Sequence, residues 1–370
     1  MVRIGAKASL FVSISLSVAL LTTPTHAQTC APLRGVNLAG AEFGEALPGT
    51  FGTDYTYPSK ETIKHFADLG AGIIRLPFAW PRLQRELYAP LDREELSRLK
   101  ETVNAIHAEG MVLLLDPHDY ARYKGQVVGS SAVPNAAFAD FWRRLTEEFG
   151  GDDRTILSLT NEPYDMEARQ WLRAANAAIA AIRQAGSRQL ILVPGIHYTG
   201  AHSWQSDWPG GNNGRIMRGV VDPADNFAYD VHQYLDEDFS GRNLRCPRSK
   251  DALQALQRMT RWLDRYDKRA FLGEFGAAKT PKCLSGLVSM ASYLNGQPER
   301  WIGWTAWAAG DWWPENDPLS LQPYSDGREQ EQMLALKPYM RCEASAGSTT
   351  KPSSKATGLP MDLGFESLRR

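Results

Sequence analysis

The chain has 370 residues, of which 43% are hydrophobic, so it is long enough for one large domain or two ordinary ones with a substantial core. Its formal net charge of −1 gives no reason to expect nucleic acid or an anionic membrane as a partner. The 11 Trp and 13 Tyr residues stand out, because many of them fall in polar, Gly-rich stretches where a role in the core is a weak explanation.

The N-terminus has the pattern of a secretory signal peptide over residues 1–27. Arg3 and Lys7 form its positive start, residues 8–21 are apolar and uncharged, and Ala27 closes a small-residue cleavage site. The apolar run is too short for a comfortable membrane span. We therefore expect a protein that is secreted, either to the outside or to the periplasm.

Short apolar runs bounded by Gly or Pro predict strands along the whole chain. They lie at residues 34–38, 71–77, 111–116, 156–160, 189–194, 227–232, 270–273 and 301–307. Stretches with helical spacing or composition predict helices at residues 59–69, 91–108, 135–149, 165–185, 249–266, 281–295 and 328–340. Ser59 is a suitable N-cap for the first helix, and a loop rich in Trp and Gly is expected at residues 195–214.

This alternation predicts an α/β protein with a single (β/α)8 (TIM) barrel over residues 28–342, rather than an open doubly wound sheet. No dinucleotide fingerprint or P-loop follows any of the predicted strands. From residue 343 the composition shifts to Ser, Thr, Gly and Lys without apolar period. We expect residues 343–370 to be a disordered, low-complexity tail.

Two predicted strands end in a carboxylate. The run Ile156-Leu-Ser-Leu-Thr-Asn-Glu-Pro-Tyr164 places Glu162 directly before Pro163, which pushes its backbone towards the extended region and predicts Glu162 as the last extended residue. Glu274 ends the run that begins at Phe271. Two carboxylates at strand ends are the minimum equipment for cleaving a glycosidic bond.

Other polar and aromatic residues also follow the predicted strands, and in a barrel their side chains face one pocket. They are Arg75, His118, Asn161, His232, Tyr234 and Trp307.

The order and spacing of several motifs resemble glycoside hydrolase family 5, and within it the endo-β-1,4-glucanases (cellulases). The resemblance runs from about Arg34 to Met340. It rests on the stretches Arg34-Gly-Val-Asn-Leu-Ala-Gly-Ala-Glu-Phe43, Ile74-Arg-Leu-Pro77, Thr160-Asn-Glu-Pro163, Asp230-Val-His-Gln-Tyr-Leu-Asp236, Gly273-Glu-Phe-Gly276 and Gly303-Trp-Thr-Ala-Trp-Ala-Ala-Gly310.

The resemblance implies a retaining glycoside hydrolase with Glu162 as acid/base and Glu274 as nucleophile. Tyr234 and Arg75 would keep the nucleophile ionised. Asn161 would bond the 2-hydroxyl of the sugar that is attacked. A set of further side chains would bind the substrate, a β-glucan polysaccharide or oligosaccharide: His118 and His232 in the polar shell, Trp307 as the platform under the sugar, and Trp204 and Trp208 as aromatics of the cleft.

Two residues depart from the pattern of the family. Tyr164 stands where close relatives usually have His, and Asp311 stands where Pro is common before the pair Trp312 and Trp313. Both leave the preferred polymer open, so a β-mannanase or a mixed-linkage glucanase is the alternative function. A carbohydrate-binding barrel without catalysis is the alternative from another class.

Structural roles are the competing interpretation for each of these residues. Glu162 could favour the start of the next helix through its dipole, and Glu274 could be a buried ion-pair partner. Arg75 and the two histidines could make structural hydrogen bonds. Trp307 could pack in the core, whereas Trp204 and Trp208 lie in a loop where a core role is less expected.

Four cysteines remain after signal removal, and an even number in an exported protein favours two disulfides. In a closed barrel, Cys30 with Cys342 would join the first and last elements, and Cys246 with Cys283 would join two neighbouring loops. Free buried thiols, and a lipid anchor on Cys30, are the alternatives. We expect no metal and no cofactor, since no Cys or His cluster suggests zinc. No stretch of the sequence argues for an oligomer, so we expect a monomer.

Overall fold

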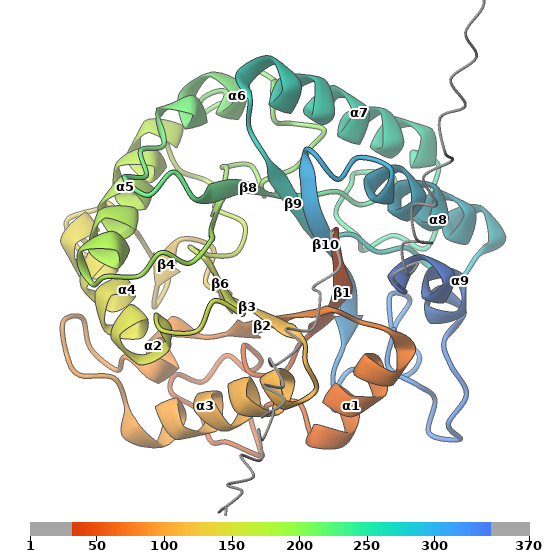
Figure 1. Cartoon of the computed structure of the whole chain (residues 1–370), viewed down its shortest axis with the longest axis horizontal. Helices are drawn as coiled ribbons and strands as arrows, with labels where there is room; N and C mark the ends of the chain where they lie inside the picture. The colour runs from red at the N-terminus through yellow and green to blue at the C-terminus, as the bar shows by residue number, and fades with distance from the viewer. Residues whose placement is uncertain (1–31, 342–370) are drawn as a thin grey trace, which may run out of the picture.

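The computed structural model describes residues 32–341, which form a closed barrel of parallel strands surrounded by helices (Figure 1). The strand order around the barrel is β1-β10-β9-β8-β7-β6-β3-β2, so the first and last strands are neighbours. These strands are β1 (Leu33–Leu38), β2 (Ile73–Phe78), β3 (Val112–Pro117), β6 (Thr155–Ser158), β7 (Ile191–Pro194), β8 (Phe227–His232), β9 (Ala270–Glu274) and β10 (Trp301–Ala309). The predicted (β/α)8 barrel is confirmed.

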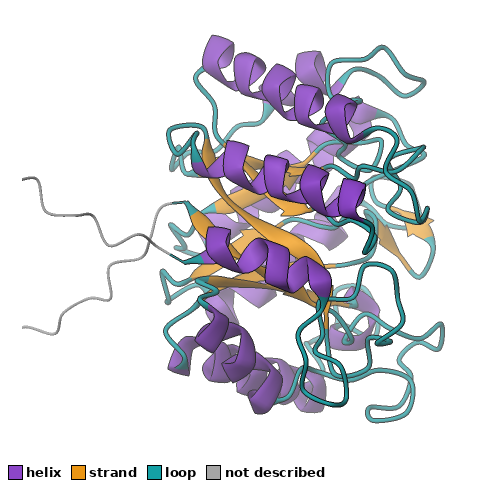
Figure 2. Ribbon diagram, turned by 90° about the vertical axis from the view of Figure 1, so that its right-hand side faces the viewer, coloured by secondary structure: helices purple, strands orange, loops and turns teal. Residues whose placement is uncertain are grey.

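The helices lie outside the strands, and the long loops gather at the end of the barrel opposite to the ends of the described chain (Figure 2). The helices are α1 (Lys60–Leu69), α2 (Trp80–Leu83), α3 (Arg93–Ala108), α4 (Asn135–Phe149), α5 (Ala168–Gln184), α6 (Asn213–Ile216), the 3-10 turn η1 (Met217–Gly219), α7 (Ser249–Tyr266), α8 (Pro281–Asn295) and α9 (Glu331–Met340). A small hairpin of β4 (Arg122–Tyr123) and β5 (Gln126–Val127) lies in the loop after β3.

The strand residues alternate between two apolar environments. In β3, Leu113 and Leu115 belong to the main core cluster, whereas Val112 and Leu114 belong to a smaller cluster shared with Ile73, Ile156, Leu192, Ala228 and Phe271. Since successive side chains of a strand point to opposite faces, the smaller cluster fills the inside of the barrel. Residues that continue this alternation towards the strand ends therefore also point inwards.

Local signals account for several helix boundaries. Ser59 caps α1 as predicted, accepting a hydrogen bond from the backbone N–H of Thr62, and Gly70 ends this helix with a φ of 101°. The Asp92 side chain caps α3 in the same way. The helices predicted to begin at residues 165 and 328 begin later, at Ala168 and Glu331, and the loop after β7 holds the unpredicted α6.

A disulfide joins Cys246 in the loop after β8 to Cys283 in the first turn of α8, as predicted. The other predicted pair, Cys30 with Cys342, lies outside the described residues, as do the predicted signal peptide and the tail at residues 343–370. Within residues 32–341, none of the helices has both the length and the apolar character needed to cross a membrane.

Candidate active site

The strand alternation brings polar side chains together above the apolar cluster inside the barrel. Arg75 lies two residues after Ile73 in β2, and Asp116 lies two residues after Leu114 in β3. In β8, Asp230 and His232 follow Ala228 in the same way. The register also pairs His232 with Glu274, across a shift in the ladder, so that the ends of β8 and β9 present neighbouring side chains.

Arg75 is the centre of this polar layer and has no exposed side-chain surface. Its Nη1 donates to Glu274 Oε1 (2.7 Å) and to Asn37 Oδ1 (2.8 Å). Its Nη2 donates to Asn161 Oδ1 (2.8 Å) and lies 2.9 Å from Asp116 Oδ2. One guanidinium thus fixes side chains from β1, β3, β9 and the loop after β6, which is a use of its planar fork of donors that lysine could not reproduce.

Glu274 is surrounded by groups that favour its ionised form. The hydroxyl of Tyr234 donates to Oε2 (2.8 Å), and Nδ1 of His232 lies 3.6 Å from the same oxygen. Burial raises the pKa of Glu274, but the charges of His232, Arg75 and His118 and the Tyr234 hydrogen bond outweigh burial and lower the pKa to about 2. Glu274 is therefore a carboxylate at neutral pH.

Glu162 lies in the opposite electrostatic situation, in the loop between β6 and α5. Burial is the main cause that raises the pKa of Glu162, and the charge of Glu274 raises it further, against the lowering effect of the His232 contact. Its Oε1 lies 2.7 Å from Nδ1 of His232. The two carboxyl groups thus have environments that push their pKa values apart, as an acid and a nucleophile require.

The backbone at Glu162 differs from the expectation. Glu162 has a φ of 34°, in the left-handed region, so the prediction that it is the last extended residue is wrong. The strand itself already ends at Ser158 rather than at Thr160. The bias towards extended backbone before Pro163 is overridden by long-range contacts, since Pro163 accepts a hydrogen bond from the backbone N–H of Tyr198 and Glu162 contacts His232.

Glu162, His232 and Glu274 offer side-chain atoms that all lie within 4.8 Å of one another, a spacing at which a cation could also be held. The charge of Arg75, 2.7 Å from Glu274, opposes a cation there. The two carboxyl groups of a retaining glycosidase lie about 5 Å apart, and the limit of 4.8 Å between one oxygen of each glutamate is compatible with that separation. The two glutamates are therefore candidates for a catalytic pair.

His118 and Asn161 form the next part of the site. Nδ1 of His118 lies 2.7 Å from Asp116 Oδ2, which favours a proton on that nitrogen, and Nε2 lies 3.1 Å from Nδ2 of Asn161. The half-exposed ring of Trp307 stacks on His118, with 5.4 Å between the ring centres and 19° between the planes. The structure thus brings Arg75, His118, Asn161, His232, Tyr234 and Trp307 together with the glutamates.

Comparisons with known proteins agree with this geometry. Residues 29–310 match the family model of cellulase (glycosyl hydrolase family 5). The chain belongs to glycosyl hydrolase family 5. It is a glycoside hydrolase, and the predicted family is confirmed.

Several named relatives align with most of this chain. It is 37% identical to endo-beta-1,4-glucanase A of Emericella nidulans over 82% of its length and 91% of the relative. The structure of XacCel5A in complex with cellopentaose is 44% identical with a TM-score of 0.82, over 84% of this chain and 99% of that one. An endo-beta-1,4-glucanase of Xanthomonas axonopodis pv. citri is 40% identical with a TM-score of 0.82, over 84% and 98%.

Of the two loop tryptophans predicted to line the cleft of this family 5 enzyme, only Trp208 is exposed, with 51% of its surface. Trp204 has no exposed surface and packs edge-to-face against Tyr229 and Trp262, so its predicted contact with substrate is wrong. The side chain of Asn213 bonds both the N–H and the C=O of Ile196 and so ties the two ends of this loop together.

The two departures from the family pattern have different environments. Tyr164 stacks on Tyr198, with 4.9 Å between the ring centres, and the guanidinium of Arg122 lies over Tyr164 at 3.9 Å. Asp311 instead accepts hydrogen bonds from Ser59 and from the Thr62 hydroxyl at the start of α1. Asp311 therefore ties the loop after β10 to α1. Of the following pair, Trp312 is exposed and Trp313 packs edge-to-face on Trp307.

Three polar residues of the site were not among the predicted ones. Asn37, Asp116 and Asp230 are buried inside the barrel, and each lies at or near the end of an apolar strand. Asn37 anchors to the barrel by donating to the carbonyls of Gly273 and Ala306. A polar residue that keeps the inward alternation of its strand was the available signal for Asp116 and Asp230.

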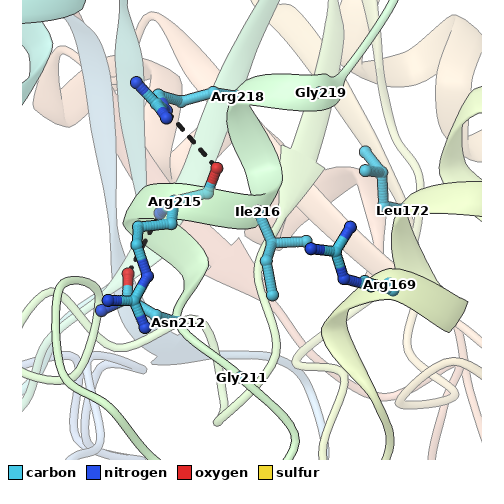
Figure 3. A pocket seen from close by; sticks show the side chains of 8 residues that line it. All are labelled: Arg169, Leu172, Gly211, Asn212, Arg215, Ile216, Arg218 and Gly219. Carbon is cyan, nitrogen blue, oxygen red and sulfur yellow. Dashed lines mark hydrogen bonds between the residues drawn. The ribbon is translucent and has the colours of Figure 1, made fainter.

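A hollow of about 560 Å³ lies away from these residues, between α5 and the turn formed by α6 and η1 (Figure 3). Arg169 extends into it towards Ile216. Its other arginines already have partners, since Arg215 pairs with Asp207 and Arg218 lies over the ring of Tyr266. None of the predicted site residues lines this hollow.

Proposed function

We propose that this chain is a secreted endo-β-1,4-glucanase that hydrolyses internal β-1,4-glucosidic bonds with retention of configuration. The observation that carries the proposal is the pair of carboxyl groups, Glu162 and Glu274, which lie within 4.8 Å at their nearest side-chain atoms and have pKa values shifted in opposite directions. The names of the similar proteins support β-1,4-glucan as the substrate. The similar protein XacCel5A holds cellopentaose in its solved structure, which supports the same class of substrate.

In the first step, Glu274 attacks the anomeric carbon and forms a covalent glycosyl ester, while Glu162 gives its proton to the departing glycosidic oxygen. Glu274 is suited to attack because Arg75, His232 and Tyr234 favour its ionised form. Glu162 is suited to donate because its raised pKa retains the proton. In the second step, Glu162 takes a proton from water, and the water oxygen displaces Glu274 from the sugar.

The other residues position the sugar that is attacked. The Asn161 amide carries two hydrogens on Nδ2, and one of them faces His118, so the second is available for the 2-hydroxyl of the sugar. Trp307 provides the platform under the ring, since its indole is half-exposed and is held by stacking on His118. Trp208 lies further out, where an exposed ring suits a more distant sugar of the chain.

Secretion is supported by the predicted signal peptide at residues 1–27 and by the disulfide between Cys246 and Cys283, which needs an oxidising compartment to persist. N-terminal sequencing of the protein recovered outside the cytoplasm should begin at Gln28. A full-length chain retained in the cytoplasm would contradict secretion without affecting the proposed activity.

The function is tested by measuring reducing-sugar release from carboxymethyl cellulose, β-mannan and mixed-linkage glucan. We expect release from carboxymethyl cellulose by the wild-type enzyme and by Glu331→Gln, a matched change on the outer helix α9, and none by Glu274→Gln. Proton NMR of the first product should show the β-anomer, as retention requires. Release from mannan alone would overturn the substrate, and an α-anomer as first product would overturn the mechanism.

A further inference from the structure

Beneath the catalytic pair, the barrel holds a buried carboxylate that the proposed mechanism does not use. Asp230 in β8 has no exposed surface, and its Oδ2 accepts a hydrogen bond from the hydroxyl of Ser158 (3.2 Å). Its other oxygen, Oδ1, has no hydrogen-bond partner. A buried carboxylate oxygen without a partner is costly, so its position calls for a function.

The atom that faces Oδ1 is a ring nitrogen of the histidine between the two catalytic glutamates. Nε2 of His232 also lacks a hydrogen-bond partner and lies 3.8 Å from Asp230 Oδ1, a separation that fits an ion pair. The other ring nitrogen, Nδ1, lies 2.7 Å from Glu162 Oε1. Asp230, His232 and Glu162 therefore form a line that leads from the barrel interior to the proposed acid.

Gly273 provides the space for this arrangement. A Cβ atom at residue 273 would lie 2.4 Å from Asp230 Oδ1 and 2.9 Å from His232 Nε2. Both unpartnered atoms thus rest against the backbone of β9, one residue before Glu274. Any side chain at residue 273 would push these two atoms out of place, which explains why glycine is required here.

We propose that Asp230 is a positioning residue that holds a proton on Nε2 of His232, so that Nδ1 is the nitrogen that shares a proton with Glu162. This proposal deepens the proposed function and rests on it. In an imidazole, the partner of one nitrogen decides which tautomer is present. With Nε2 protonated against Asp230, one further proton is shared between Nδ1 and Glu162 Oε1. When that proton lies on Glu162, Nδ1 accepts the hydrogen bond and orients the carboxyl group towards the leaving group.

The charged groups around Asp230 and His232 are consistent with this role. Burial raises the pKa of Asp230, against the lowering effect of the charges of His232 and of Arg75 from β2, while Asp116 from β3 and Glu274 from β9 raise it further. Glu162, Glu274 and Asp230 act on His232. Burial lowers the pKa of His232, but these three carboxyl groups outweigh burial and raise it. Removing Asp230 would take away a negative charge near Glu162 and would free the opposite tautomer, in which Nδ1–H donates to the Glu162 carboxylate. Both changes lower the pKa of Glu162.

The first test is nitrogen-15 NMR of the histidine side chains in the full chain, with His232 assigned by its absence from a His232→Gln sample. We expect Nε2 to be the protonated nitrogen of His232 throughout the pH range of activity. An unprotonated Nε2 in the wild-type protein would overturn the proposal. This measurement needs no glucanase activity, so its failure is distinguishable from failure of the proposed function.

The second test compares Asp230→Ala with Asp230→Asn. We expect Asp230→Ala to lower kcat on carboxymethyl cellulose about tenfold or more with KM little changed, and to move the alkaline limb of kcat/KM to lower pH. Asp230→Asn should recover part of the loss, because an amide oxygen can accept from Nε2–H. A matched control is Glu95→Gln, a buried carboxylate that accepts from Tyr55 and Tyr57 outside the site and should change stability alone.

A folded Asp230→Ala protein with an unmoved alkaline limb and unchanged kcat would overturn the proposal. If Asp230→Ala does not fold, the NMR result on the wild-type protein and the pH profile of the isosteric Asp230→Asn decide. Equal shifts of the limb in Asp230→Asn and Glu95→Gln would show that the effect comes from stability, and would also contradict the proposal.

Discussion

Nη1 of Arg75 lies 2.7 Å from Oε1 of Glu274, with the guanidinium fully buried and the carboxylate almost so. An ion pair this deep is expensive to desolvate, and the hydrogen bonds made by Nη1 and Nη2 offset part of that cost, while Nε of Arg75 has no hydrogen-bond partner among the described residues. Asn37, Asp116 and Asn161 contact the same guanidinium. Arg75 therefore sets both the charge and the position of the proposed nucleophile.

Replacing Arg75 with Lys should reduce kcat/KM by about ten- to a hundredfold, because a single ammonium group cannot contact Glu274 and both asparagines together. Glu274 must be ionised to attack, and its pKa is lowered in part by Arg75. The weaker contact should raise that pKa and move the acid limb of kcat/KM to higher pH. Arg82→Lys is the matched control, since Arg82 is also buried but donates to backbone carbonyls outside the site. An acid limb that stays in place in Arg75→Lys would show that other groups set the ionisation of Glu274.

Glu162→Gln should lower the rate on unactivated glucans by about a hundredfold or more, because no proton is then given to the leaving oxygen. Aryl glycosides with a good leaving group should be affected much less at their first step. The alkaline limb of kcat/KM should also disappear, since the pKa of Glu162 is the raised one. Equal loss on both classes of substrate would show that Glu162 is not the general acid.

Dialysis against a chelator should leave kcat/KM unchanged, because the proposed steps need only the two glutamates and the charge of Arg75. The test is informative because Glu162, His232 and Glu274 lie close enough together to hold a cation. Activity that is lost on dialysis and restored by one particular divalent cation would contradict the assignment of these side chains to acid and nucleophile.

Trp204→Ala should destabilise the protein by about 3–5 kcal/mol, as expected for deleting a buried indole, while the folded fraction keeps its activity. Trp208→Ala should leave the melting temperature nearly unchanged and raise KM on long glucans, because this ring is half-exposed. Thermal unfolding and initial rates on the two variants distinguish these roles. The reverse pattern would restore Trp204 to the substrate cleft.

The barrel could be predicted because each strand is an apolar run, and each glutamate of the proposed catalytic pair stands at or just beyond the end of one. Leu113 and Leu114 illustrate why the detail was harder: both are buried, but in clusters on opposite faces of β3. The apolar residues of such a run do not show which face is inside, so in β3 only the polar Asp116 at the end of the strand marks the inward face. Trp204 was wrongly predicted to be exposed, because the composition of the loop does not show that Asn213 bonds the backbone N–H and C=O of Ile196.

The pair of Tyr164 and Tyr198 needed the structure for the same reason. The two residues are far apart in sequence, and their parallel stacking depends on the hydrogen bond from the backbone N–H of Tyr198 to Pro163. Neither a propensity nor a period signals such a contact. The sequence alone could therefore show that Tyr164 departs from the family pattern, but not what it touches.

The left-handed backbone conformation of Glu162 costs folding stability. A residue other than glycine at a φ of 34° is strained by about 1–3 kcal/mol, and here it also carries a carboxyl group held next to another one. Glycine at this position would relieve the backbone strain and the repulsion between the carboxyl groups, and would give a more stable fold that lacks the proposed general acid. Selection for thermal stability alone would thus remove the residue proposed as the general acid, and any effort to stabilise the enzyme must keep Glu162 unchanged.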